Sequence, residues 1–211
     1  MAHAEDQFDR LGSTSRTPAQ LRMLGAALDL FAEHGVGATS YQMIADRLGV
    51  TKAAIYHKFK TKEDLVIAVA DMELAKLQDA IEEAEEQGCD TQARELLLAR
   101  VVDHAVEHRR AAHILQFDPV VVRLLSEHRP FQLFLERLYR ALTSGQRDPG
   151  TDVQLAIVLS AISGTVTHPL AAQRDDRALR SQLLHGARLL LDLPDSGKRR
   201  RPRRVSRPQA S

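Results

Sequence analysis

One glycine between two short apolar repeats constrains the fold of this chain more than any other feature. The stretch from Thr39 to Leu65 reads TSYQMIADRLGVTKAAIYHKFKTKEDL, with Gly49 near its middle. Apolar residues recur on both sides of the glycine: Ile44, Ala45 and Leu48 before it, and Val50, Ile55 and Phe59 after it. Residues three or four apart share one face of a helix, and glycine tolerates the positive φ of a sharp turn. The stretch therefore predicts two short helices joined by a tight turn.

The residue types at the crossing of these two helices are typical of a helix-turn-helix. Small Ala45 lets the helix backbones approach each other, and Ile55 fills the angle between them. Such a unit places its second helix in the major groove of DNA. Between Thr39 and Lys62 there are five basic residues and a single acid, Asp46. A local basic patch favours phosphate contact, so we expect this part of the chain to bind DNA.

Helical periodicity covers most of the chain, and no stretch sustains a two-residue alternation. One helix is expected to begin at Thr17-Pro18 and to stop at Gly35, with Thr39 or Ser40 capping the next. Thr51 and Thr61 are the expected caps of the two helices that follow, and the second of these is expected to run to about Gln87. Further helices are expected over 93–108, 120–127, 131–143, 151–168 and 176–193. The fold class is therefore all-α, with about nine helices.

Three sequence features indicate the cellular compartment in which the protein is expected. The single cysteine, Cys89, excludes an internal disulfide and fits a reducing environment. The N-terminal sequence MAHAEDQFDR carries acids and no apolar core, unlike a secretory signal. The longest apolar run, 155–162, is interrupted by Ser160 and is shorter than the ~20 residues that span a membrane. We expect a cytoplasmic protein without a membrane segment.

The region 17–65 resembles the N-terminal part of the tetracycline-repressor (TetR) family of bacterial regulators. The matching positions are Ala38-Thr39-Ser40, Ile44-Ala45, Leu48–Lys52, Ile55–Phe59 and Thr61–Leu65. The sequence departs from the family pattern at three positions, where the family often has an acid, an aromatic residue and a proline: Met43, Lys58 and Lys60. The two lysines add positive charge near the groove.

The resemblance implies a dimeric repressor that binds a palindromic DNA operator and is released by a small-molecule effector. Together with the composition of the two ends, it predicts four segments: a disordered N-terminus (1–16), the helix-turn-helix DNA-binding domain (17–65), an effector-binding and dimerisation domain (66–194) and a disordered basic tail (195–211). We expect no cofactor and no catalytic activity.

The second helix of the pair is expected to turn Ile55 and Phe59 inward and its other side toward DNA. On that side Ala53 permits close approach, and its methyl can meet a thymine methyl. Hydroxyl, imidazole and ammonium groups nearby are donors for phosphates. The predicted DNA-binding residues are Thr39, Ser40, Gln42, Thr51, Lys52, Ala53, Tyr56, His57, Lys58 and Lys62. The alternative for each residue alone is a solvated helix face.

Two apolar stripes in the C-terminal half are candidates for the dimer interface. The stripes lie on the helices expected over 151–168 and 176–193. These two helices from each subunit can form a four-helix bundle with twofold symmetry. The alternative is that the stripes pack only into the core of their own subunit. The predicted interface residues are Leu155, Leu159, Ile162, Val166, Leu183 and Leu190.

The sequence identifies the effector site less clearly than the DNA-binding residues. Aromatic residues make up 4% of the chain and tryptophan is absent, which favours an aliphatic or lipid-like effector over a flat aromatic one. The alternative assignment for each candidate is ordinary core or surface. The candidate ligand-binding residues are His104, His113, Gln116, Phe117, Phe134 and Ser163.

A different class of function is suggested by His104-Ala-Val-Glu107-His108, which matches the H-x-x-E-H zinc motif of one metallopeptidase group. Two histidines four residues apart on a helix can hold one Zn²⁺, with the glutamate acting on a bound water. Against this, Arg109 and Arg110 add positive charge beside the site, and no motif supplies a third ligand. A metal-binding helical protein or zinc hydrolase is therefore the alternative, and an interaction scaffold with an accidental helix-turn-helix pattern is a third possibility.

The tail has a charge pattern of its own. The range 198–207 holds seven basic residues and no acid, whereas residues 1–197 carry 22 basic and 28 acidic residues. This asymmetry predicts either a flexible electrostatic arm on DNA or a solvated tail without a partner.

Overall fold

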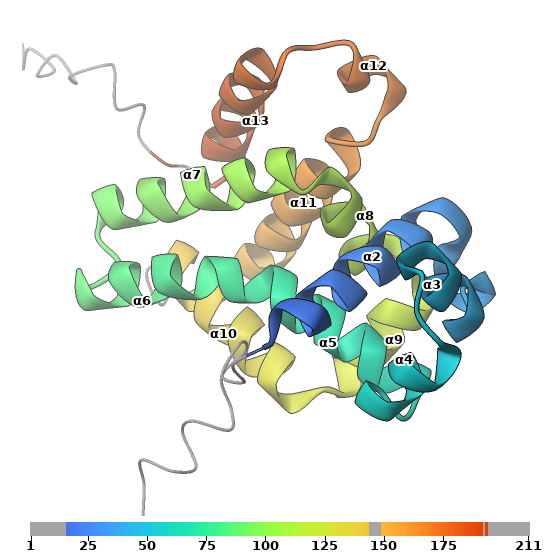
Figure 1. Cartoon of the computed structure of the whole chain (residues 1–211). Helices are drawn as coiled ribbons and strands as arrows, with labels where there is room; N and C mark the ends of the chain where they lie inside the picture. Colours follow the sequence, from blue (N-terminus) through green and yellow to red (C-terminus); the bar gives the residue numbers. More distant parts are fainter. Residues whose placement is uncertain (1–15, 144–148, 192, 194–211) are drawn as a thin grey trace, which may run out of the picture.

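The computed structural model describes residues 16–143, 149–191 and 193, and within these ranges the regular structure is entirely helical (Figure 1). The expected N-terminal arm up to residue 15 and the basic tail from residue 195 lie outside the described residues. Among the described helices, none is long and apolar enough to cross a membrane. The predicted all-α fold class is confirmed.

Four helices form the N-terminal end of the molecule: α2 (Pro18–Ala38), α3 (Tyr41–Leu48), α4 (Lys52–Lys58) and α5 (Lys62–Leu74). A side-chain oxygen caps each of them, from Thr17, Ser40, Thr51 and Thr61. Regular helix geometry in α2 is interrupted at Gly35, where φ is 79°. Gly49 ends α3 in the left-handed conformation, with φ 65°, as the turn requires.

The helical path from Lys62 continues beyond α5 with one irregularity. A 3-10 turn, η1 (Ala75–Leu77), joins α5 to α6 (Gln78–Glu86). The single long helix expected to reach about Gln87 is therefore two α-helices in line, and Gln87 is the C-cap of the second.

Seven helices make up the rest of the described chain: α7 (Thr91–Glu107), α8 (Arg109–Phe117), α9 (Pro119–Glu127), α10 (Arg129–Thr143), α11 (Pro149–Thr165), α12 (Pro169–Ala172) and α13 (Asp176–Leu190). The helix α8 was not expected, because the predicted helices left the residues between 108 and 120 unassigned. It is separated from α7 at His108, whose φ and ψ of −117° and 46° are not helical. Such short breaks divide the described residues into more helices than the nine expected.

Two hydrophobic clusters fill the interior. The head cluster joins buried side chains of α2 to α5 with Ile114, Val121 and Leu125 from α8 and α9. The body cluster joins buried side chains of η1, α6, α7, α10, α11 and α13. Figure 1 shows α3 and α4 together at one end of the molecule, with α6 and α13 away from them. The chain thus has one core for its N-terminal helices and a second for its C-terminal helices.

Candidate nucleic-acid interface and C-terminal half

Helix α4 has two clearly different sides. Ile55 is fully buried and Phe59, which follows the last turn, is nearly so, and both belong to the head cluster. The helix begins where Thr51 Oγ1 accepts a hydrogen bond of 3.2 Å from the Ala54 N–H. A helix of seven residues has little stability alone, so these anchors and the cap hold it.

The opposite side of α4 faces solvent with small and basic residues. Lys52, Ala53, Tyr56, His57 and Lys58 are all exposed, as the spacing predicted. The Tyr56 ring is 53% exposed and lies edge-on to the Tyr41 ring, with 6.5 Å between centroids. The Lys60 ammonium lies 5.2 Å from the centroid of the Tyr56 ring, a cation–π contact. These contacts restrain the tyrosine at a surface that carries positive charge.

One apolar residue of the turn is not part of the inner side. Val50 was expected on the apolar face of the second helix, but it is 40% exposed, so that expectation is wrong. The residue lies between the left-handed Gly49 and the cap Thr51, before α4 begins. Helical periodicity therefore does not apply to its side chain.

The residues ahead of α3 divide between surface and interior. Ser40 is exposed, and its Oγ accepts a hydrogen bond of 3.3 Å from Met43 N–H. Gln42 is exposed and donates from Nε2 to Asp46 Oδ1 at 2.7 Å. Thr39 is only 3% exposed, because its hydroxyl donates to the carbonyls of Leu30 and Gly35 at the end of α2. The expectation that the Thr39 side chain faces DNA is therefore corrected: it closes the end of α2.

Lys62 joins two of the helices that flank the helix-turn-helix unit. Its ammonium donates to the Gly37 carbonyl at 2.9 Å, which ties the first residue of α5 to the end of α2. At the same point Thr61 and Asp64 form a reciprocal capping box, as predicted. The start of α5 is thus fixed to α2 and to its own first turn.

The candidate effector residues are not brought together in one cavity. His113, Gln116 and Phe117 lie on α8 against α11: Gln116 Nε2 donates to Ser160 Oγ at 3.1 Å, and the Phe117 ring lies beside Gly164. Phe134 is buried in the body cluster and stacks on Phe131. His104 lies in the last turn of α7, near Glu73 and His108, and Ser163 is half-buried on α11. The residues were selected from separate helices by side-chain type, and the packing places them at different sites.

The predicted dimer stripe lies largely inside the subunit. Leu155, Ile162 and Val166 are buried in the body cluster, and Leu159 and Leu183 are half-buried against it. Of the predicted interface set, Leu190 is the exposed member. The large apolar side chains that α11, α12 and α13 expose most are Val153, Ile157, Leu170 and Leu189.

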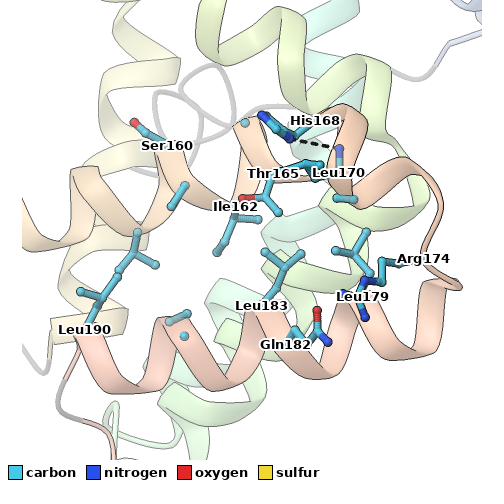
Figure 2. A pocket seen from close by; sticks show the side chains of 16 residues that line it. Ser160, Ile162, Thr165, His168, Leu170, Arg174, Leu179, Gln182, Leu183 and Leu190 are labelled. Atoms are coloured by element: carbon cyan, nitrogen blue, oxygen red, sulfur yellow. Dashed lines mark hydrogen bonds between the residues drawn. The ribbon is translucent and has the colours of Figure 1, made fainter.

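A groove with a volume of about 610 Å³ separates α11 from α13 (Figure 2). Figure 2 shows Ile162 and Thr165 from α11 and Leu183 from α13 facing the space between the two helices. Gly186 also lines this groove, and apart from its chain neighbours and the backbone of its own helix no described atom lies within 4 Å of the position that a Cβ would occupy there. The surface formed by the two helices is therefore mainly apolar and has an open concave strip.

The glutamate of the H-x-x-E-H motif does not join the two histidines. Glu107 is exposed and accepts a hydrogen bond from Arg180 of α13 at 2.9 Å. The carboxylate near His104 and His108 is that of Glu73 on α5, which sequence reasoning missed. Its one local signal was an acidic residue on the same buried face as Val66, Val69 and Ala70. The zinc-hydrolase interpretation of the motif is not supported, because Glu107 is turned away.

Comparisons with known proteins agree with the helix-turn-helix geometry. Residues 23–69 match the model of the family described as bacterial regulatory proteins, tetR family. The HTH-type transcriptional repressor KstR2 of Mycolicibacterium smegmatis is 28% identical over 156 residues, covering 67% of this chain and 75% of that protein.

Solved structures share the whole fold at lower identity. A TetR-like transcriptional regulator from Rhodococcus sp. RHA1 has a TM-score of 0.64 at 19% identity, covering 84% of this chain and 98% of that chain. The regulator FadR from Bacillus subtilis, solved in complex with stearoyl-CoA, has a TM-score of 0.58 at 21% identity, with coverages of 83% and 99%. The chain is a helix-turn-helix transcriptional regulator whose N-terminal helices, over residues 23–69, are those of the tetR family of bacterial regulatory proteins.

Proposed function

We propose that the chain is a homodimeric repressor that reads a palindromic operator through α4 and is released by an aliphatic or acyl-type effector. The observation that carries the DNA-reading part is the division of α4 into two sides. Ile55 and Phe59 fix one side in the head cluster, so the side with Lys52, Ala53 and Tyr56 is held outward in a single orientation.

The exposed residues fall into two roles. Lys52 and Ala53, in the first turn of α4, are the base-reading residues, because recognition helices contact base edges with their N-terminal residues. Tyr56, His57 and Lys58 offer donors for phosphates, as do Ser40, Gln42 and Thr51. Lys62 uses one of its three N–H donors on the Gly37 carbonyl, which leaves donors for a phosphate.

The dimer is proposed to form through the α11–α13 surface. Val153 and Ile157 on α11 are 58% and 51% exposed, and Leu189 and Leu190 extend the apolar surface on α13. A second copy placed across a twofold axis would cover these side chains and fill the groove at Gly186. We call the helix-turn-helix pair α3–α4 the reading head. The two reading heads of one dimer match the two half-sites of a palindrome, one helical turn (about 34 Å) apart.

The effector class rests on composition and on a neighbour. The chain lacks tryptophan and is poor in aromatic residues, which disfavours a stacking site for flat aromatic molecules. The FadR neighbour binds stearoyl-CoA, an acyl-type ligand. An effector that prefers a conformation with the two α4 helices off the groove spacing weakens operator binding by its differential affinity.

Selection from a library of random DNA duplexes tests the reading head. We expect enrichment of an inverted repeat whose half-sites lie one helical turn apart. On the selected duplex, Lys52→Ala should change which bases are preferred, whereas Tyr56→Ala should weaken binding to selected and scrambled duplexes alike. Each loss should be about tenfold or more.

The matched control is Arg100→Ala, which removes an exposed cation from α7, away from the helix-turn-helix. It should bind like the parent chain. If selection enriches no repeat, or if Tyr56→Ala binds as tightly as the parent at physiological salt, the assignment of α4 is wrong. Release of the selected duplex by stearoyl-CoA and not by acetyl-CoA tests the effector class, and equal effects of the two would contradict it.

A further inference from the structure

Three potential metal ligands meet where α5 contacts the end of α7. Glu73 is in the last turn of α5, His104 is in the last turn of α7, and His108 is the residue at which α7 gives way to α8. One ligand atom from each of the three side chains lies within 4.8 Å of the other two. The two histidines are four residues apart, and their ring centroids are 4.8 Å apart. This cluster lies outside the helix-turn-helix and outside the α11–α13 groove.

Two polar atoms of the cluster are buried without a hydrogen-bond partner in the described part of the chain: Glu73 Oε2 and His104 Nε2. The Glu73 side chain is 3% exposed, and its other oxygen accepts a hydrogen bond of 2.8 Å from Lys76 Nζ. The nearest approach of a histidine to Glu73 Oε2 is His108 Nδ1 at 3.6 Å, beyond hydrogen-bond distance. A buried carboxylate oxygen without a partner is costly, and a cation bound between the three groups would satisfy it.

The arginines next to the cluster are directed elsewhere. Arg109 pairs with Asp176 of α13, and Arg110 Nη1 lies 3.1 Å from Asp29 Oδ1 of α2. The positive charge that the sequence places beside His108 is therefore neutralised by carboxylates on two other helices. The remaining cation at the cluster is Lys76, whose 40% exposed side chain has room to move into solvent.

We propose that Glu73, His104 and His108 bind one first-row transition-metal ion, with Zn²⁺ the best match. Two imidazoles and one carboxylate are a ligand set that Zn²⁺ accepts, with a water in the fourth position. Distances of up to 4.8 Å between ligand atoms must shorten by about 1 Å or more to bring all three to about 2.0–2.2 Å from one ion. Rotation of the half-buried histidines supplies that movement.

Metal binding here would connect the two cores of the molecule. The buried residues of α5 before Glu73 belong to the head cluster, while Leu77 and the buried residues of α7 belong to the body cluster. An ion held by Glu73 from α5, His104 from α7 and His108 at the junction of α7 and α8 therefore fastens α5 to the helices of the body. We expect Zn²⁺ to stabilise the protein against unfolding by an amount that grows with the logarithm of the Zn²⁺ concentration relative to the dissociation constant.

The test uses the full chain without an affinity tag, after treatment with a chelator. Zn²⁺ is titrated against a chromogenic competitor, and Co²⁺ is used as a visible spectroscopic probe. We expect one Zn²⁺ per subunit, ligand-field absorption from bound Co²⁺, and a higher unfolding temperature with Zn²⁺. Glu73→Gln, His104→Gln and His108→Gln should each lower the affinity by at least about tenfold and abolish the thermal shift.

The matched control is His113→Gln, because His113 is an exposed histidine on α8 outside the cluster. It should keep the affinity and the spectrum of the parent. Glu73→Gln conserves size, and its helical content and unfolding temperature in chelator separate loss of the site from loss of the fold. Absence of Co²⁺ absorption in the parent, or equal Zn²⁺ affinity in the parent and His104→Gln, would overturn the site. No DNA is present, so the result is independent of the proposed operator binding.

Discussion

Helices α4 and α11 were both expected to present a face to a partner, and they differ in how clearly the sequence identifies that face. In α4 the inner residues are apolar and the outer ones are small, polar or basic, so burial follows the spacing of Ile55 and Phe59. In α11 apolar residues occur all around the helix: Leu155 and Ile162 are buried, while Val153 and Ile157 are exposed.

The difference teaches that periodicity finds an apolar stripe without saying what covers it. A helix that is apolar on every side can be covered by its own subunit on one side and by a partner on another. The stripe chosen from the sequence of α11 is the one covered by α7, α8 and α13 of the same chain. The surface left for a second copy begins at the neighbouring positions.

The largest expected effect comes from a charge on the inner side of α11. Leu155 is fully buried in the body cluster, so Leu155→Asp places an unpaired carboxylate in an apolar interior. We expect the free energy of unfolding to fall by more than about 4 kcal/mol, with loss of the native far-UV circular dichroism at moderate temperature. A folded Leu155→Asp chain that remained dimeric would reverse the assignment of inner and outer sides.

A smaller effect is expected when the aspartate is placed at Ile157, on the outer side of α11. Ile157→Asp leaves the carboxylate in water in the isolated subunit but buries it in the proposed dimer. We expect the dissociation constant of the dimer to rise by at least about 100-fold while the helical content stays unchanged. Sedimentation equilibrium measures the mass in solution. The control is Val122→Asp on α9, an exposed apolar residue away from α11 and α13, which should remain dimeric. If both variants dimerise equally, another surface forms the dimer.

The smallest effect is expected from removing the N-terminal cap of α5. Thr61→Ala removes the hydroxyl that accepts from Asp64 N–H at 3.0 Å and half of the capping box. We expect a loss of about 1 kcal/mol in the free energy of unfolding, measured by urea denaturation. Thr91→Ala is the control, since Thr91 is exposed at the start of α7 but Asp90 caps that helix. Equal stabilities for the two variants would show that the local cap does not hold α5.

The head was predictable because its signals act over three or four residues. The caps at Thr17, Ser40, Thr51 and Thr61, and the turn at Gly49, each depend on neighbours in the sequence, and the structure confirms them. The exposed side of α4 followed from the same short spacing.

Other features depend on contacts between distant segments. Thr39 is buried because its hydroxyl reaches the Leu30 carbonyl on the preceding helix, which no local pattern indicates. Glu73 meets His104 only because the fold brings the end of α5 beside the end of α7. The candidate effector residues likewise share a chemical type but not a place, since helix packing determines their neighbours.

The 3-10 turn at Ala75–Leu77 has a consequence for angular register along the path from α5 to α6. A residue in a 3-10 helix turns about 120° around the axis, against about 100° in an α-helix, so three such residues add about 60° of rotation. The buried side chains of α6 therefore point in a different azimuth from those of α5, which lets two consecutive helices serve two cores. Restoring α-helical pitch at these three residues would rotate the reading head relative to the body without lengthening any loop.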